Sequence, residues 1–228
     1  MSEHMALENL TVLDLTRVLA GPFCTMMLAD MGANVIKIEV PKGGDDTRSY
    51  PPFRAKNLNG ERESVYFANI NRNKKGITLN LKAPEGKEIF KELVKKADIV
   101  VENYRPGVMD KLGLGYDVLK EINPRIIYAA VSGFGCYGPY HLRPGYDILA
   151  QAMGGMMSIT GSKGGEPTRA GSALGDILGG LHVTIGILAA VNARTITGKG
   201  QRVDVSLMDS MIAATENTAL KYIETGNI

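Results

Sequence analysis

The sequence predicts an α/β protein built on a doubly wound, mostly parallel sheet of the Rossmann-like type. Short, apolar, β-rich segments alternate with helix-like segments along much of the chain, as in repeated β-α-β units. The first such unit, from Thr11 to Val40, has the usual length of about 30 residues. A chain of 228 residues, with 44% hydrophobic and 22% charged residues, is also long and apolar enough to bury a large core.

The individual elements follow from apolar periodicity and from the turn residues between them. The first unit comprises a strand at Thr11–Leu15, a helix at Pro22–Met31 and a strand at Asn34–Val40, with Gly32 capping the end of the helix. Further strands are predicted at Gly76–Leu81, Asp98–Glu102, Arg125–Val131 and Arg202–Leu207. Further helices are predicted at Pro84–Ala97, with Ile89, Phe90 and Leu93 on one apolar face, and at Tyr116–Ile122, Tyr146–Met153, Asp176–Arg194 and Met208–Ile223.

Other stretches lack these patterns. Pro41–Lys75 is rich in Pro, Gly and charged residues, and we expect a long loop there. Residues 133–146 and Gly154–Gly171 are rich in Gly and are also expected to be loops. We therefore assign residues 1–205 to one large domain and residues 206–228 to a helix that leads out of it.

Composition excludes several classes of partner. A net charge of +2 argues against a broad basic surface for nucleic acid or an anionic membrane. The longest apolar stretch, Ile177–Val191, is interrupted by glycines and is predicted to be a buried helix and not a membrane span. Cys24 and Cys136 are far apart and form no metal-binding pattern, so we expect no metal, no disulfide and a cytoplasmic location.

The loop after the first predicted strand, Thr16–Pro22, is the first candidate site. In open α/β sheets ligands bind beyond the carboxyl ends of the strands, and a helix N-terminus there offers free N–H groups to an anion. The alternative is a plain tight turn with a solvated Arg17, since no G-x-G-x-x-G fingerprint is present.

Two more segments carry polar side chains near predicted strands. The cations of Asn71–Lys75 are suited to a phosphate group, but such a run is also typical of a solvated face. Asn103–Gly107 follows a buried strand, where a parallel sheet binds ligands, although Pro106 and Gly107 equally fit a turn.

Asp176 stands at the predicted start of a long apolar helix. Its local sequence favours a helix cap, because Asp is a preferred N-cap residue and complements the helix dipole. The alternative is a carboxylate nucleophile, which is ionised at pH 7 and needs no general base. Nearby glycines, such as Gly175, Gly179 and Gly180, would then let a substrate approach the backbone.

Seven segments, taken in order, resemble the class III CoA-transferases. They are DLTRVLAGPF, ADMGANVIKIE, GDDTR, NRNKKGITLNL, ADIVVENYRPGVMDKLGLGYD, GYDILAQAMGG and GDILGGLHVTIGILAA. This family includes formyl-CoA:oxalate and carnitine CoA-transferases and α-methylacyl-CoA racemases, and the form of the motifs is closest to the succinyl-CoA:glutarate-like branch. The resemblance implies a Rossmann-like, CoA-binding large domain and an enzyme that moves coenzyme A from an acyl-CoA to a carboxylic acid, with CoA as substrate and no permanently bound cofactor.

The resemblance also assigns roles to residues. Asp176 corresponds to the family's nucleophile, with Tyr146, Asp147, Leu19 and Gly175 as its neighbours. The implied CoA contacts are Arg17, Val18, Leu19, Ala20, Arg72, Asn73, Lys75, Asn103, Tyr104, Val108, Lys111 and Leu112. Backbone N–H groups near Gly133–Gly135, or at the start of the Asp176 helix, are candidates to stabilise oxyanions.

Tyr146 favours a transferase over a racemase. The racemases have a His at this position, because moving a proton at the α-carbon needs an acid and a base that face each other. A tyrosine, with a pKa of about 10, is a poor substitute. Racemase activity is the first alternative function.

The resemblance extends from about Leu7 to Asn217, whereas full-length members of the family are longer. They have a small second domain, a Gly-rich loop over the active site and a return to the large domain, and two chains interlock as a homodimer. An inactive CoA-binding fragment is therefore the second alternative for a chain of 228 residues.

Overall fold

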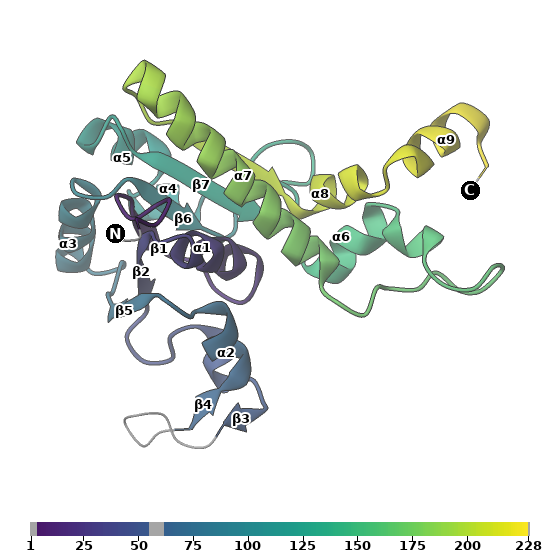
Figure 1. Cartoon of the computed structure of the whole chain (residues 1–228), viewed down its shortest axis with the longest axis horizontal. Helices are drawn as coiled ribbons and strands as arrows, with labels where there is room; N and C mark the ends of the chain where they lie inside the picture. Colours follow the sequence, from purple (N-terminus) through teal and green to yellow (C-terminus); the bar gives the residue numbers. More distant parts are fainter. Residues whose placement is uncertain (1–3, 55–61, 228) are drawn as a thin grey trace.

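A six-stranded parallel sheet forms the centre of the computed structural model, which describes residues 4–54 and 62–227 (Figure 1). Its strands lie in the order β5-β2-β1-β6-β7-β8, and each neighbouring pair is parallel. The strands are β1 (Thr11–Asp14), β2 (Asn34–Glu39), β5 (Lys75–Thr78), β6 (Ile99–Glu102), β7 (Ile127–Ser132) and β8 (Arg202–Ser206). The predicted Rossmann-like α/β class is confirmed.

The strand order reverses between β1 and β6. From β1 the chain adds β2 and β5 on one side, and after β5 it crosses back to place β6, β7 and β8 on the other side. The connections that leave β1 and β6 therefore diverge, which opens a crevice at the carboxyl ends of these two strands.

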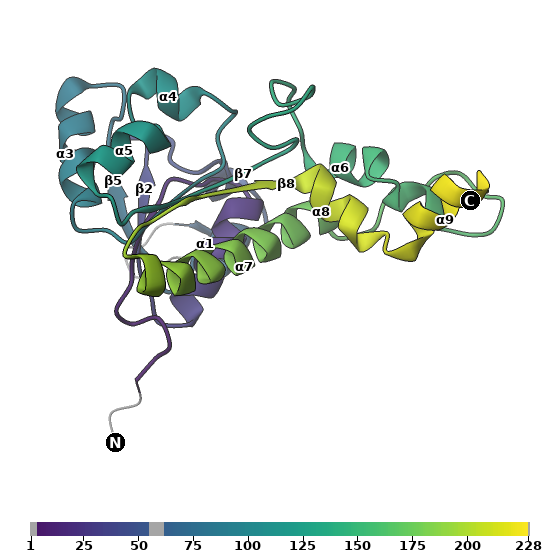
Figure 2. The same cartoon turned by 90° about the horizontal axis from the view of Figure 1, so that it is seen from above.

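Helices cover both faces of the sheet, giving three layers (Figure 2). On one face α1 and α7 pack around Val12, Val101 and Val183, and on the other α3 and α5 pack around Leu13, Phe90 and Val100. The helices are α1 (Ala20–Asp30), α2 (Val65–Ile70), α3 (Pro84–Val94), α4 (Val108–Leu112), α5 (Tyr116–Ile122), α6 (Asp147–Met153), α7 (Leu174–Thr197), α8 (Leu207–Ala214) and α9 (Asn217–Thr225). Cys24 is buried in the first of these cores and both cysteines are free, as predicted.

The segment predicted as one long loop, Pro41–Lys75, contains regular structure. It forms the 3-10 turn η1 (Asp46–Ser49), the small antiparallel pair β3 (Phe53–Arg54) and β4 (Glu63–Ser64), and α2; residues 55–61 of this segment lie outside the described part. The prediction missed α2 because a helix of six residues shows too little periodicity. It is fixed by Ser64, whose hydroxyl accepts a hydrogen bond from Phe67 N–H, as an N-cap does.

Three further predictions need correction. The short helix α4 was not predicted. The expected final helix Met208–Ile223 is two helices, α8 and α9, because the chain breaks at Glu216, whose φ is +56°. On α3 the side chain of Ile89 is exposed and the buried face is formed by Phe90 and Val94.

The longest helix, α7, is buried on one face only. Val183, Ile187 and Ala190 are fully buried against the rest of the protein, but Ile185 and Ile196 on its outer side are 62% and 82% exposed. The prediction of a buried helix is therefore wrong for the outer face. By length and composition alone, α7 would be able to cross a membrane, a criterion that core helices of soluble proteins also meet.

Helices α6, α8 and α9 extend from the sheet to one side, and the C-terminus lies at the far end of this projection (Figure 1). Large apolar side chains on it, including Ile148, Leu220 and Ile223, are exposed. The start of α8 also packs on the large core through Leu207 and Met211. The predicted boundary between a large domain at residues 1–205 and a leading-out helix at residues 206–228 stays a prediction.

Candidate active site

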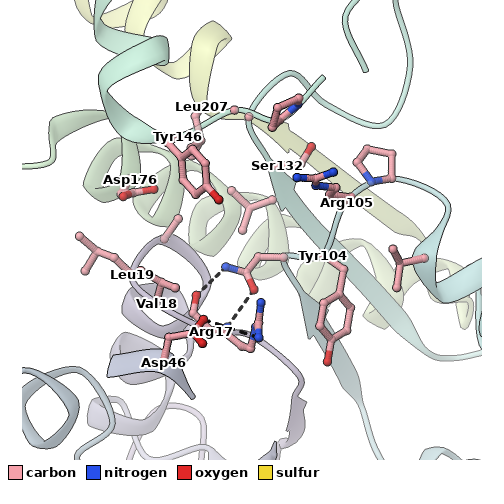
Figure 3. Close-up of a pocket in the computed structure, with 18 of the residues that line it drawn as sticks. Arg17, Val18, Leu19, Asp46, Tyr104, Arg105, Ser132, Tyr146, Asp176 and Leu207 are labelled. Carbon is pink, nitrogen blue, oxygen red and sulfur yellow. Dashed lines mark hydrogen bonds and ion pairs between the residues drawn. The ribbon is translucent and has the colours of Figure 1, made fainter. Parts of the chain in front are cut away.

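A cavity of about 550 Å³ opens at the carboxyl ends of the strands, in the crevice where the strand order reverses (Figure 3). It is lined by the loops that follow β1, β6 and β7, by the start of α7 and by the start of α8. The lining residues are Arg17, Val18, Leu19, Ala20, Asp46, Tyr50, Asn103, Tyr104, Arg105, Pro106, Val108, Val131, Ser132, Gly133, Arg143, Pro144, Gly145, Tyr146, Asp176 and Leu207. The structure thus brings together predicted residues from positions 17 to 176.

The loop between β1 and α1, residues 16–19, forms one wall and is called the first loop below. The backbone of Arg17 is bonded to the side chain of Asn103, in the loop after β6. The Arg17 N–H donates to Asn103 Oδ1 at 2.8 Å, and the Arg17 carbonyl accepts from Asn103 Nδ2 at 2.7 Å. The Arg17 guanidinium lies 3.5 Å from the Asp46 carboxylate. Because α1 begins at Ala20, its N-terminus faces the cavity, which suits an anionic ligand.

Asp176 lies in the first turn of α7 and not at its cap. The N-cap position is Ala173, which makes no side-chain hydrogen bond to the helix, so the capping interpretation is wrong. Burial, and then the Asp147 carboxylate, raise the pKa of Asp176 from 3.8 to about 7. The expectation of a fully ionised carboxylate at pH 7 is therefore corrected: the carboxylate titrates near neutral pH and not well below it.

Asp147 holds the start of α7 in place. It is buried, and its carboxylate accepts hydrogen bonds from Gly175 N–H at 2.8 Å and from Gln151 Nε2 at 2.8 Å. Because Gly175 N–H is engaged in this way, it is not available to an oxyanion. Tyr146, the N-cap residue of α6, is 70% exposed and stands beside Asp176 at the cavity (Figure 3).

Two tyrosines of the site were not singled out from the sequence. Tyr50 lines the cavity, and Tyr66 lies against it with their rings in an edge-to-face arrangement 5.9 Å apart. Burial and the charge of Asp176 raise the pKa of Tyr66 to about 12, so its hydroxyl stays protonated. Both come from the stretch expected to be a loop, and the only signal for them was their aromatic type among charged residues.

Three cations line the cavity: Arg17 was a predicted CoA contact, Arg105 lies in the candidate segment Asn103–Gly107, and Arg143 was not predicted. Arg105 and Arg143 have no ion-pair partner among the residues that the structure describes, whereas Arg17 has Asp46. The Arg105 side chain lies beside Ser132, whose hydroxyl is buried without a hydrogen-bond partner in the described chain (Figure 3).

Other residues predicted to contact CoA lie away from the cavity. Arg72 and Asn73 bind Asp30 at the end of α1, and Lys75 Nζ donates to Asn34 at 2.8 Å. These contacts are at the amino ends of the strands, the opposite edge of the sheet from the first loop. Of the predicted residues in α4, Val108 lines the cavity, whereas Lys111 and Leu112 do not.

The glycines near Asp176 serve helix packing and do not open the backbone to a substrate. A Cβ at Gly179 would lie 2.4 Å from the Leu207 side chain, and one at Gly180 would lie 2.8 Å from the Ala20 carbonyl. A Cβ at Gly175 would lie 3.1 Å from the Asp147 carboxylate. These glycines therefore let α7 approach α1, α6 and α8 closely, which fixes Asp176 at the cavity.

The fold and the cavity are typical of an α/β protein that binds a ligand at the carboxyl edge of its sheet, where the Asp176 carboxylate has no ion-pair partner among the described residues. The chain belongs to CoA-transferase family III, whose model matches residues 7–228. The resemblance found in the sequence motifs is thereby confirmed.

Several relatives carry names of CoA-transferases. An acyl-CoA transferase of Fusarium pseudograminearum is 49% identical, and the match covers 99% of this chain and 50% of the relative. A succinyl-CoA:mesaconate CoA-transferase of Haloarcula marismortui is 48% identical, covering 95% of this chain and 55% of the relative. Human succinyl-CoA:glutarate CoA-transferase is 46% identical, and the match covers 98% of this chain and 50% of the relative. The chain spans about half the length of the curated relatives it matches.

Solved structures agree with the fold. A CAIB/BAIF family protein from Brucella suis superimposes with a TM-score of 0.94 at 44% identity, over 99% of this chain and 59% of that one. A hypothetical protein, Rv3272, from Mycobacterium tuberculosis gives a TM-score of 0.87 at 34% identity, over 97% and 60%.

Proposed function

We propose that this chain carries the CoA-binding and nucleophilic half of a CoA-transferase that moves coenzyme A from an acyl-CoA to a carboxylic acid. The observation that carries the proposal is the Asp176 carboxylate at the cavity, without a cation partner in the described chain, in a lining that it shares with the first loop and the N-terminus of α1. A carboxylate with a pKa near neutrality and a position in a cavity is typical of a reacting group.

The proposed mechanism uses Asp176 as a covalent carrier. Its carboxylate attacks the thioester carbonyl of the donor acyl-CoA, which forms a mixed anhydride and releases CoA thiolate. The thiolate attacks the Asp176 carbonyl, forming an aspartyl-CoA thioester and releasing the donor acid. The acceptor carboxylate then attacks this thioester to form a second anhydride, and the released thiolate captures the acceptor acyl group, which restores Asp176.

The residues around Asp176 support this chemistry. Only the ionised form attacks a carbonyl, so the pKa of about 7 leaves a large reactive fraction at neutral pH. The protonated Tyr66 hydroxyl and the N–H groups near Gly133, which lines the cavity, are the proposed donors to developing oxyanions. Anhydrides and thioesters hydrolyse easily, so the cavity has to exclude water during the reaction.

We propose dicarboxylic acids as the substrates. The names of the mesaconate and glutarate transferases given above support this class. The cavity supports it as well, because a free carboxylate that leaves water needs a cation, and the guanidinium groups of Arg105 and Arg143 have no ion-pair partner in the described chain.

The alternative racemase activity has less support. Among the described residues that line the cavity there is no histidine, and Tyr146 occupies the place that a second acid–base group would need. Deuterium from the solvent should therefore not enter the α-carbon of a 2-methylacyl-CoA that is incubated with the protein without an acceptor acid. Incorporation would favour the racemase.

The experiment that tests the proposal traps the intermediate. The protein is incubated with succinyl-CoA and treated with borohydride or hydroxylamine, and the modified residue is mapped by mass spectrometry. We expect the label on Asp176 in the parent protein. The E102Q variant is the control, because it removes another buried carboxylate whose pKa is also raised to about 7, and it should carry the same label. No label is expected in D176N. A label on another residue contradicts the mechanism.

The same samples test the fragment hypothesis. CoA binding measured by calorimetry, together with the absence of both label and exchange, would support a CoA-binding fragment that needs a further polypeptide for catalysis. The absence of CoA binding would contradict the proposed function of this chain altogether.

We also propose that the complete protein is a homodimer without a nucleic acid or membrane partner. The support is the apolar outer face of α7, with Leu181, Ile185 and Ile196, and the exposed apolar residues of α9. Light scattering after gel filtration of the complete protein should give twice the mass of one chain, and a monomer would contradict this.

A further inference from the structure

The first loop has an unusual backbone conformation at Val18. Its φ is +69°, which lies in the left-handed region that a β-branched residue rarely adopts. Such a conformation is strained and persists only where surrounding contacts enforce it. No sequence feature of the loop itself favours it, since the residue is not Gly, Asn or Asp. The cause must therefore lie in the contacts that the loop makes.

Four side chains hold the backbone of three consecutive residues in this loop. Asp14, Lys37, Asp45 and Asn103 are together called the loop clamp below. At Thr16, the N–H donates to Asp14 Oδ1 at 2.9 Å and the carbonyl accepts from Lys37 Nζ at 2.8 Å. At Arg17, both backbone groups bond to Asn103, and at Val18 the N–H donates to Asp45 Oδ1 at 3.2 Å.

The three charged members of the clamp are buried in two ion pairs, the second of which is completed by Lys74. Lys37 Nζ lies 2.9 Å from Asp45 Oδ2, and Lys74 Nζ lies 3.0 Å from Asp14 Oδ2. All four side chains are at most 2% exposed. Burial of Asp14 raises its pKa, but Lys74 and Lys37 outweigh this and lower it to about 2, so Asp14 stays ionised. Two cations and two anions thus form a neutral cluster beneath the first loop.

Stability alone does not account for this cluster. A buried ion pair is typically no more stabilising than well-packed apolar residues of the same size, because desolvation of the charges offsets their attraction. What apolar residues would lack is directed hydrogen bonds to the loop backbone. Lys37, Asp45 and Asp14 each make one such bond, to Thr16 or Val18, in addition to their ion pair.

We propose that the loop clamp is a positioning device that holds Val18 in the left-handed conformation, so that Leu19 and Ala20 lead into α1 at the cavity wall. Its members are positioning residues that act on CoA binding through the first loop. Asn103, which lines the cavity and is a predicted CoA contact, is then also a clamp residue, because its amide oxygen and nitrogen both bond to the Arg17 backbone. The consequence for CoA rests on the proposed function; the conformation of the loop does not.

The first test is a double-mutant cycle on CoA affinity, measured by calorimetry. If Asp45 holds a strained Val18, D45N should weaken CoA binding about tenfold, equal to about 1.4 kcal/mol. Glycine adopts positive φ without strain. In the V18G background the same D45N change should therefore weaken binding less than about twofold. An equal loss in both backgrounds would overturn the proposal, since a merely structural Asp45 would matter regardless of residue 18.

The matched control is a buried ion pair at the opposite edge of the sheet. Arg194, which is 6% exposed, pairs with Asp98 at 3.0 Å. R194M should lower the melting temperature but leave the CoA dissociation constant unchanged. If R194M weakens CoA binding as much as D45N does, the effect of D45N is a general loss of stability and the proposal fails.

A second measurement needs neither CoA nor the buried charges. N103A removes the two bonds to Arg17 from a side chain at the rim of the cavity, so the variant should fold even if D45N does not. Amide hydrogen exchange over residues 16–19 should rise at least about tenfold in N103A, but not in R194M. Unchanged exchange in N103A would overturn the clamp. If the parent protein fails to bind CoA while N103A still loosens the loop, the proposed function fails and the clamp stands.

Discussion

The two edges of the sheet use charged residues in opposite ways. At the amino edge Arg194 binds Asp98, which also accepts a hydrogen bond from Thr11 N–H at 2.9 Å, and Lys75 binds Asn34. At the carboxyl edge, Asp176 has neither a cation nor a hydrogen-bond donor in the described chain, and the charged group that raises its pKa, Asp147, is also acidic. The paired charges of the amino edge contribute to stability, whereas the carboxyl edge holds, besides the paired charges of the loop clamp, the Asp176 carboxylate without a partner among the described residues.

Backbone geometry shows the same contrast. The connection into β6 at the amino edge is a short turn from α3, closed by Ala97 N–H to Val94 O at 3.2 Å. The connection out of β1 at the carboxyl edge holds Val18 at positive φ. It is bound by the four side chains of the loop clamp, which come from β1, from β2, from the N-cap residue of η1 and from the loop after β6. A β-branched residue at positive φ and a carboxylate without a described partner both lie at the carboxyl edge, and together they indicate the functional end of the molecule.

The largest difference between the edges should appear when a carboxylate is replaced by its amide. D176N should lower CoA exchange between succinyl-CoA and an acceptor acid by at least about a thousandfold, because an amide is not a competent nucleophile. D98N, the matched change at the amino edge, should keep exchange within about twofold. Chromatographic assay of the acyl-CoA products measures both. Comparable losses in the two variants would mean that Asp176 has no special role.

Stability should show the reverse order. Removing Arg194 leaves the Asp98 carboxylate half-buried without its cation, which should lower the free energy of unfolding by about 2–3 kcal/mol. R194M is compared with the parent protein by urea denaturation at pH 7.5. A loss below about 0.5 kcal/mol would show that the amino edge does not contribute in the way proposed.

The pH dependence of exchange should report Asp176. Its pKa is raised to about 7, and only the ionised carboxylate attacks, so the rate should fall about tenfold per pH unit below pH 6 and level off above pH 8. Glu102, whose pKa burial also raises to about 7, is the competing explanation. The midpoint should persist in E102Q. If it disappears there, Glu102 and not Asp176 controls the profile.

The sequence predicted the sheet because its signals are local. Apolar, β-rich runs such as Thr11–Leu15 and Arg125–Val131 are readable without knowledge of the partners, and the βαβ rule then places their carboxyl ends together. The same rule selected the loops at Arg17 and Asn103, and the structure joins these residues by two hydrogen bonds.

What the sequence did not predict depends on contacts between distant residues. Tyr66 belongs to the site only because α2 folds back toward Asp176, and nothing near Tyr66 in the sequence shows this. Likewise, Lys37 is a polar residue within a strand, and its role is visible only when Asp45 and Thr16 are placed around it. In Asn71–Lys75, Lys74 is buried on Asp14, whereas the neighbouring cations that were chosen as CoA contacts lie elsewhere.

The smallest expected effect is on folding stability, which the ionised Asp176 carboxylate lowers. The pKa of Asp176 is raised from 3.8 to about 7 on folding, so the folded protein binds a proton more tightly than the unfolded chain. Protonated Asp176 therefore adds to the free energy of unfolding. This contribution is fully present below about pH 4 and is lost as the pH rises through 7. D176N has no such loss, so at pH 8 it should be more stable than the parent protein by about 1–2 kcal/mol, after allowance for water at the cavity mouth.

Urea denaturation at pH 5 and at pH 8 measures the difference in the free energy of unfolding between D176N and the parent protein. This gap in stability should be smaller at pH 5. E102Q should give a gap of the same sign, because burial also raises the pKa of Glu102. The two gaps should add in the double variant if the groups titrate independently. Equal stability of D176N and the parent protein at pH 8 would mean that the Asp176 carboxylate is solvated in the folded state, and the contrast between the edges would then rest on the strained first loop alone.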